Sequence, residues 1–184
     1  VLGMARDITQ LRETQIALEE RIKEQKCLHA VFHATEDLQK PLAEVMQTVV
    51  DLLPAGWLYP DISAARIEYD GQSFSTANFV NSAELDQQNA VIQIDGLVLG
   101  QITVAYLQPR PIQQEGPFLS EERILLDTIA ERLSSFIKRR NAEEKARNRE
   151  RIFSAIVSQA SDAIFLIVAV RFLFIEFYVG GLLG

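Results

Sequence analysis

Apolar residues recur at helical spacing through residues 9–53, where no glycine occurs. We therefore expect a helix from Thr9, with Asp7 or Thr9 as its cap. Its apolar positions follow a rough heptad pattern that polar residues interrupt, which is typical of a helix that needs a partner helix. The apolar positions of this seam are Leu11, Leu18, Ile22 and Phe32, and the polar ones are Gln15, Gln25 and His29.

Pro41 divides this helical region, because proline lacks a backbone donor and its ring clashes with the preceding turn. We expect Lys40 to end the first helix and Pro41 to open a second, which Pro54-Ala55-Gly56 ends. The apolar stripe of the second helix comprises Leu42, Val45, Met46, Val49, Leu52 and Leu53.

The period then changes to two, and Asp70-Gly71 and Asp95-Gly96 each separate two alternating runs. An Asp-Gly pair in that position is a strong hairpin indicator. We therefore expect four antiparallel strands in a meander, with residues 81–88 as the polar loop between the hairpins. The alternating apolar residues are Ala65, Ile67 and Tyr69, then Ala90, Ile92 and Ile94, then Ile102, Val104 and Tyr106.

A long helix follows the loop 109–117, and no proline or glycine interrupts residues 120–165. We expect the Ser120 side chain to cap this helix. Its buried stripe is Leu125, Ile129, Leu133 and Phe136 or Ile137. After Lys138 the helix becomes highly charged and keeps only a thin apolar seam, as in a solvated coiled coil. The expected fold class is therefore α+β, with long coiled-coil-type helices flanking the sheet.

Composition narrows the functional classes. The chain has 184 residues, of which 48% are hydrophobic, so we expect a packed core. A net charge of −7 argues against a nucleic-acid partner, which would require a basic face. A single cysteine, Cys27, excludes an internal disulfide and suits a reducing, cytoplasmic compartment. Residues 1–9 read as the last strand of an upstream domain followed by a helix start.

Several of these segments together resemble a GAF-type sensor domain of bacterial and archaeal sensor kinases over residues 28–140. They are Leu53-Pro54-Ala55-Gly56-Trp57, the two Asp-Gly hairpins, Gly100-Gln101-Ile102-Thr103-Val104 and Gly116-Pro117-Phe118-Leu119 before Glu121. The resemblance implies a sensory module of a two-component signalling protein. Neither a cysteine near the expected pocket nor the Asn-Lys-x-x-x-Phe-x-x-x-Asp-Glu pattern of cyclic-nucleotide-binding GAF domains is present. The ligand therefore stays unknown, and no covalent bilin or haem is expected.

The flanks resemble parts of PAS domains. Arg6-Asp7-Ile8-Thr9 resembles the exit of one such domain, and Arg151-Ile152-Phe153 with residues 158–164 resembles the entry of another. The implied organisation is an upstream PAS-like end (1–9), a signalling helix (10–40), the GAF-like domain (28–140), a linker helix (138–152) and a truncated or aberrant PAS-like start (152–184).

The segment 163–184 is nearly all apolar but contains Arg171 and Glu176. A transmembrane helix needs about 20 apolar residues, and each central charge costs about 2.5–3.5 kcal/mol. Valine, isoleucine and phenylalanine dominate, which suits strands at least as well as a helix. The alternatives are a membrane anchor, a truncated PAS sheet and read-through from a frame error. We favour the last two, and expect no membrane partner.

The aromatic residues around the expected sheet are candidates for a ligand pocket. In GAF-like folds the ligand lies between one sheet face and the covering segments, so Trp57 and Tyr59 could line such a pocket with Arg66 as a polar anchor. The alternative interpretation is that these aromatic residues belong to the core. The candidate set is Trp57, Tyr59, Arg66, Phe74 and Tyr106.

Two further motifs carry candidate chemistry. His29 and His33 are one helical turn apart and could present two imidazoles to a metal ion, although they supply only part of a coordination shell. Residues 36–42 have the outline of a histidine-kinase phosphoacceptor box, but Glu36 occupies the position that must be histidine. We find no catalytic constellation, and so expect no enzyme activity in this chain, although its parent protein could carry a kinase domain.

The sequence therefore predicts a sensory or regulatory module that forms a homodimer through its flanking helices and relays the state of a small-molecule ligand or partner to an output domain outside this chain. One alternative is a dimerisation spacer between sensor domains that binds no ligand. The other is a degenerate histidine-kinase fragment.

Overall fold

The computed structural model describes the backbone of residues 2–180 and the side chains of residue 15 and residues 18–158. The chain divides into two compact units, unit 1 (residues 1–139) and unit 2 (residues 140–184). The described part contains three α-helices and one four-stranded antiparallel sheet, so the predicted α+β class is confirmed.

Helix α1 (Leu2–Ala34) occupies the start of the chain. The expected strand in residues 1–9 is wrong, because residues 2–9 are already helical. A helix satisfies its backbone hydrogen bonds internally, whereas a strand needs a neighbouring strand. The strands of this unit all pair with one another between residues 63 and 106, and none pairs with residues 2–9.

Helix α1 ends at Ala34, six residues before the predicted end at Lys40. The Thr35 hydroxyl donates to the carbonyl oxygens of Val31 and Phe32, at 2.9 and 3.1 Å, and so satisfies acceptors of the last turn. Pro41 is the N-cap residue of helix α2 (Leu42–Leu52), and its carbonyl accepts from the N–H of Val45. The prediction that Pro41 opens the second helix is confirmed.

The sheet consists of β1 (Ser63–Tyr69), β2 (Gln72–Ser75), β3 (Gln87–Ile94) and β4 (Leu97–Tyr106). Both predicted hairpins form, and Asp70 and Asp95 have positive φ, at 48° and 50°, as the first residue of a type I′ turn requires. The strand order is β2-β1-β4-β3. The predicted meander is therefore wrong, because β1 pairs with β4 and the loop between β2 and β3 joins the two edges of the sheet.

Gly100 lies where β4 passes closest to β1. A Cβ atom on this residue would stand 2.2 Å from the backbone oxygen of Glu68, which is far inside van der Waals contact. Only glycine permits this approach, so Gly100 contributes to the pairing that joins the two hairpins.

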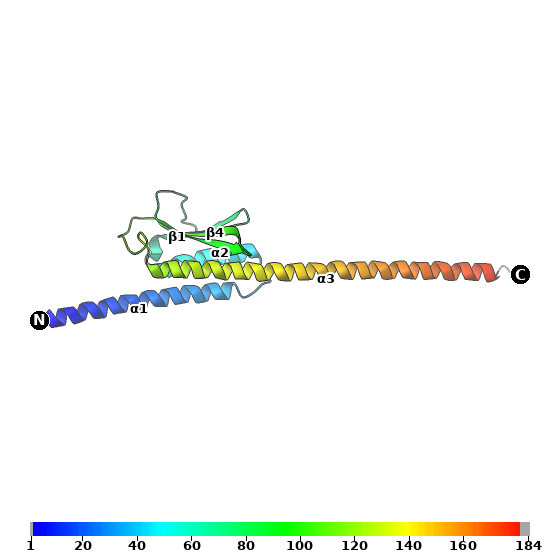
Figure 1. Cartoon of the computed structure of the whole chain (residues 1–184), viewed down its shortest axis with the longest axis horizontal. Helices are drawn as coiled ribbons and strands as arrows, with labels where there is room; N and C mark the ends of the chain where they lie inside the picture. The colour runs from blue at the N-terminus through cyan, green and yellow to red at the C-terminus, as the bar shows by residue number, and fades with distance from the viewer. Residues whose placement is uncertain (1, 181–184) are drawn as a thin grey trace. The chain divides into compact units, whose positions relative to one another are not determined.

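One face of the sheet packs against α2 and the first part of helix α3 (Ser120–Gly180), and α1 lies along α3 on the side away from the sheet (Figure 1). The predicted apolar stripe of α3 is buried throughout, and it comprises Leu125, Ile129, Leu133, Phe136 and Ile137. Two residues of α1, Cys27 and Val31, also enter this core. The core side chains of the sheet are Ala65, Ile67, Ala90, Ile92, Ile102, Val104 and Tyr106.

The start of α3 differs from the prediction in one respect. The Leu119 carbonyl accepts from the N–H of Arg123, so Leu119 and not Ser120 is the capping residue. The Glu122 carboxylate accepts from the Leu119 N–H at 2.7 Å, which is half of a capping box. The Ser120 hydroxyl instead donates to Glu121. Helix α3 continues to Gly180, so the interpretation of the segment 163–184 as strands of a truncated PAS sheet is wrong over residues 163–180.

Candidate functional site

The candidate pocket residues do not converge on one site. Trp57 and Tyr106 are fully buried in the core between the sheet and the helices, and Phe74 packs against the same core. Arg66 lies on the opposite face of the sheet, because it pairs with Thr103 while its neighbour Ile67 pairs with Ile102. The structure therefore places the aromatic side chains and their expected anchor on different sides of the sheet.

Phe79, in the loop between β2 and β3, packs against the Arg66 side chain. Its guanidinium carbon lies 5.0 Å from the centre of the Phe79 ring, and one of its terminal nitrogens lies 3.5 Å from the Glu68 carboxylate. Its Nε atom is buried and has no hydrogen-bond partner. The face around it is otherwise polar, with the Thr103 hydroxyl donating to the Asn89 side chain at 2.8 Å.

Tyr59 belongs to an aromatic cluster at the end of β4. Its ring lies edge-on to that of Tyr106, with 5.5 Å between centroids, and Tyr106 stacks on Phe118 at 4.5 Å. The guanidinium carbon of Arg110 lies 4.7 Å from the centre of the Tyr59 ring. These contacts fill the space between the rings. The cluster is therefore part of the core, and the Arg110 guanidinium packs on its outer edge.

Glu122 is a buried carboxylate that accepts three hydrogen bonds. It is 1% exposed, and its carboxylate accepts from the Leu58 N–H, the Leu119 N–H and the Tyr106 hydroxyl at 2.7, 2.7 and 2.8 Å. Burial raises the pKa of Glu122, and the three hydrogen bonds oppose that rise. Burial, with the neighbouring Glu122 charge second, also raises the pKa of Tyr106. This residue joins the segment after α2, strand β4 and the start of α3.

A second series of hydrogen bonds runs from the buried Trp57 to the partly exposed Arg123. The Trp57 indole N–H donates to Gln88, whose amide donates to Glu115 at 3.1 Å. The Glu115 carboxylate binds the Arg123 guanidinium, and this hydrogen bonding holds the pKa of Glu115 below its usual range. Both polar clusters join segments that are distant in sequence, and so they help to organise the fold.

Sequence reasoning did not identify Glu122 or Gln88 as organising residues. A glutamate at the third position of a helix is the usual partner in a capping box, which pointed to the role of Glu122. The predicted polar loop 81–88 includes Gln88, whereas β3 begins at Gln87 and Gln88 takes the inward phase of the alternation that continues through Ala90 and Ile92.

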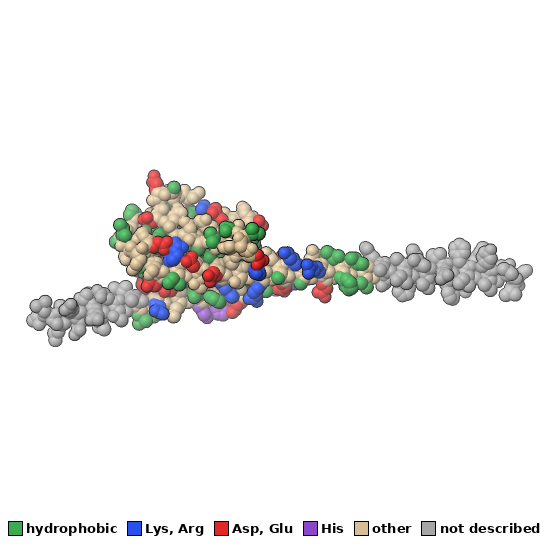
Figure 2. Space-filling view, viewed as in Figure 1, with side chains coloured by type: hydrophobic (Ala, Val, Ile, Leu, Met, Phe, Trp, Pro, Cys, Tyr) green, Lys and Arg blue, Asp and Glu red, His purple; other side chains and the backbone are tan. Residues whose placement is uncertain are grey.

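His29 and His33 are both exposed on α1, and they form the purple patch at the lower edge of the molecule in Figure 2. Their rings are 4.5 Å apart and edge-on, and the Nδ1 atom of His33 lies 3.1 Å from the Glu36 carboxylate. Among the residues with described side chains, no group of three or more histidine, cysteine, aspartate or glutamate residues is placed to hold a metal ion. Residues 36–41 of the phosphoacceptor-like segment lie in the turn between α1 and α2, and Leu42 begins α2.

Cys27 lies inside the core, where its thiol approaches the Leu52 carbonyl oxygen at 3.5 Å. Burial raises the pKa of Cys27 to about 12, because the thiolate would be poorly solvated. The thiol therefore stays protonated near neutral pH, and it behaves as a small apolar side chain.

The seam predicted for α1 is exposed in unit 1. Leu18, Ile22 and Phe32 keep 59%, 42% and 39% of their surface accessible, and Gln25 and His29 between them are exposed too. Leu11 lies outside the residues whose side chains are described. The same exposed line along α1 thus carries large apolar residues and the three predicted polar interruptions, Gln15, Gln25 and His29.

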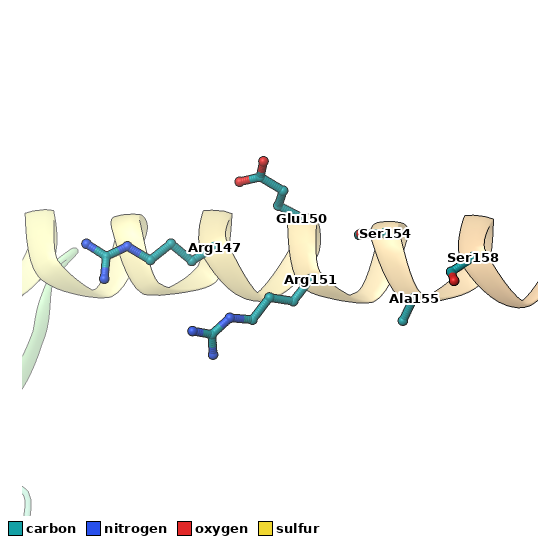
Figure 3. Close-up of a pocket in the computed structure, with 6 residues that line it drawn as sticks. All are labelled: Arg147, Glu150, Arg151, Ser154, Ala155 and Ser158. Carbon is teal, nitrogen blue, oxygen red and sulfur yellow. The ribbon is translucent and has the colours of Figure 1, made fainter.

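The described residues of unit 2, 140–180, belong to helix α3. A depression of about 530 Å³ on it is lined by Arg147, Arg151 and four neighbours that all come from this one helix (Figure 3). A single helix surface cannot enclose a ligand, so this depression is not a binding site by itself. Beside it, Ile152, Phe153, Ile156 and Val157 are exposed.

The apolar segment after residue 158 has a described backbone to Gly180, whereas its side chains lie outside the description. In the portion of the chain with described side chains, no helix combines the length and apolar character needed to span a membrane.

Comparison with known proteins adds no further assignment. The sequence matches no protein-family model, and no curated protein matches it significantly.

Proposed function

We propose that this chain is a sensory relay module of a cytoplasmic signal-transduction protein. It dimerises through α1 and α3, and it passes a change in the arrangement of these helices to an output domain outside the 184 residues. The GAF-like resemblance of residues 28–140 supports the sensory part of this proposal, and the hairpins that carry part of the resemblance are present in the fold.

The exposed seam of α1 is the observation that carries the proposal. Leu18, Ile22 and Phe32 leave much of their apolar surface in water, although burial is worth about 25 cal/mol per Å². Heptad spacing aligns them on one side of the helix, so a second helix with the same pattern would cover all three together. A second copy of this chain supplies such a helix.

The polar positions of the seam allow the helix pair of the dimer to switch between alternative arrangements. Gln25 and His29 interrupt the apolar contact, which lowers the stability of a helix pair and reduces the free-energy difference between alternative registers. A ligand then shifts the equilibrium only by its difference in affinity for the two arrangements.

The test is native mass spectrometry and sedimentation velocity of the full chain. Wild-type protein should be a dimer, and replacing Leu18 and Ile22 together by lysine should produce a folded monomer with unchanged circular dichroism. The matched control replaces Leu97 and Val98 by lysine, because both are exposed on the β3–β4 hairpin away from the seam. A monomeric wild type, or a dimer that survives the seam substitution, contradicts the proposal.

The same spectra separate a relay from a spacer. A small molecule retained by the dimer supports ligand sensing, and its mass identifies its chemical class. A dimer that carries no adduct and gains none from a metabolite mixture favours a dimerisation spacer.

A further inference from the structure

A groove of about 780 Å³ opens on unit 1 between α1 and the start of α3. One wall is formed by residues 20–28 of α1, and the other by residues 119–128, while Leu58 contributes from the segment after α2. The groove lies on the helix side of the fold, so it is distinct from the aromatic core and from the polar sheet face around Arg66. Its volume falls within the range of about 300–1,000 Å³ that small-molecule sites occupy.

The walls of the groove are mainly apolar. Leu28, Leu58 and Leu119 line it while half-buried, and Leu125 closes its base. Ile124 also lines the groove and is 65% exposed, although it stands on a helix whose neighbouring apolar residues are buried. An occupant with an apolar body would remove this surface from water.

The charge at the groove is negative. The carboxylates of Glu20, Glu24 and Glu121 line it, and Arg21 is the single cationic residue among its lining residues. Lys23 binds Glu20 at 2.7 Å, and the Arg21 charge partly offsets the rise in the pKa of Glu24. The carboxylates that line the groove still outnumber its one cationic lining residue.

Glu122 adds to this negative potential from beneath. It is buried, and it holds the backbone N–H groups of two lining residues, Leu58 and Leu119. Burial raises the pKa of Glu24, followed by the charges of Glu121, Glu122 and Glu20, so the carboxylates around the groove repel one another. A cation placed among them would relieve this repulsion.

We propose that the groove binds a small amphipathic organic cation, an alkyl- or arylalkyl-ammonium whose apolar body rests on Leu28, Leu58 and Ile124 and whose charge lies beside Glu24 and Glu121. Its role as the signal rests on the relay function proposed above, whereas the binding itself does not. Because α1 supplies one wall and α3 the other, an occupied groove favours the helix spacing found here over any arrangement that closes or widens it.

The probe is hexyltrimethylammonium, titrated into the full chain by isothermal calorimetry below its micelle concentration, with hexanesulfonate as the probe of equal chain length and opposite charge. Saturable binding of the cation alone is expected. The double variant Glu24→Gln with Glu121→Gln should weaken it about tenfold, since two partly exposed charge pairs are lost. The control Glu44→Gln removes an exposed carboxylate of α2 outside the groove and should leave the affinity unchanged.

Three results overturn the proposal: no saturable binding of the cation, equal binding of the sulfonate, or equal affinity in the double variant and the wild type. Binding that appears only when the seam substitutions dissociate the dimer also overturns it, because a second copy of the chain then occupies the groove. Sedimentation of the same samples keeps the two proposals separate. A dimer that does not bind the cation contradicts the ligand proposal and supports the dimer proposal. A monomer that binds the cation contradicts the dimer proposal and supports the ligand proposal.

Discussion

At the residue scale, buried polar groups determine how the secondary-structure elements join. Three donors from different segments converge on Glu122, and the Tyr106 hydroxyl among them is buried in the core. A buried polar group without a hydrogen-bond partner lowers the free energy of unfolding by about 1–3 kcal/mol. That is a large fraction of the total stability of a small domain.

The substitution Glu122→Gln should lower the free energy of unfolding by about 2 kcal/mol. The amide offers one acceptor oxygen in place of two, and its NH₂ group then faces a backbone N–H of Leu58 or Leu119. Urea denaturation followed by circular dichroism measures this change. Glu131→Gln, at an exposed position of the same helix, should stay within about 0.5 kcal/mol. Equal stability of the two variants would contradict the role assigned to Glu122.

The raised pKa of Glu24 gives a pH dependence with a definite sign. The folded state holds the Glu24 proton more tightly than the unfolded chain, whose ordinary value is 4.5. The stability from this group is therefore complete below that value and is lost as the pH rises through the folded-state pKa. Glu24→Gln removes this loss, so the stability of the variant relative to wild type should increase between about pH 4 and pH 7. Denaturation midpoints across that range test the sign, and a constant or falling difference would refute it.

At the element scale, Arg132 connects α3 to the end of α1. Its Nε atom donates to the Thr35 hydroxyl at 2.7 Å, a terminal nitrogen donates to the Thr35 carbonyl at 3.3 Å, and the guanidinium carbon lies 4.4 Å from the centre of the Phe32 ring. Thr35 in turn satisfies carbonyl groups in the last turn of α1, so the guanidinium stabilises the end of the helix as well as its position.

Arg132→Lys should therefore increase amide hydrogen exchange in the last two turns of α1 several-fold, since a lysine cannot make the forked contact and stack on the ring together. Hydrogen-exchange mass spectrometry of the peptide covering residues 27–35 provides the measurement. Arg139→Lys is the matched control, because Arg139 is exposed on the same helix. Unchanged protection in the Arg132 variant would show that α1 is held by its apolar contacts alone.

At the scale of the whole molecule, the core of unit 1 is complete within its own boundaries. All described residues that are buried lie between Cys27 and Ile137, whereas residues 144–158 are exposed throughout. Unit 2 therefore contributes no buried side chain among the residues described.

A fragment of residues 1–139 should consequently fold, and its free energy of unfolding should equal that of the full chain to within about 1 kcal/mol. Urea denaturation of the two proteins, each at a concentration where it is monomeric, makes the comparison. A fragment that is unfolded or markedly less stable would show that residues after 139 support the domain.

Local sequence signals determined which elements form. The period of 3.6 identified the buried stripes of α2 and α3, and the two Asp-Gly pairs identified the hairpins, because both signals arise from neighbours along the chain. The same local signals misplaced the end of α1 and the cap of α3. Thr35 and Glu122 contact the neighbouring turns at these boundaries, and they also bind Arg132 and Leu58, which are distant in sequence.

The tertiary structure alone decided how these elements combine. Hairpin signals do not state which strand of one hairpin meets the other, and the pairing of β1 with β4 depends on the close approach at Gly100 and on a shared core. That pairing places Arg66 on one face of the sheet and Trp57 and Tyr106 on the other, which separates the candidate pocket residues. The groove between α1 and α3 is likewise invisible to sequence patterns. Residues about 100 positions apart form its walls, and only packing brings their apolar and carboxylate side chains together.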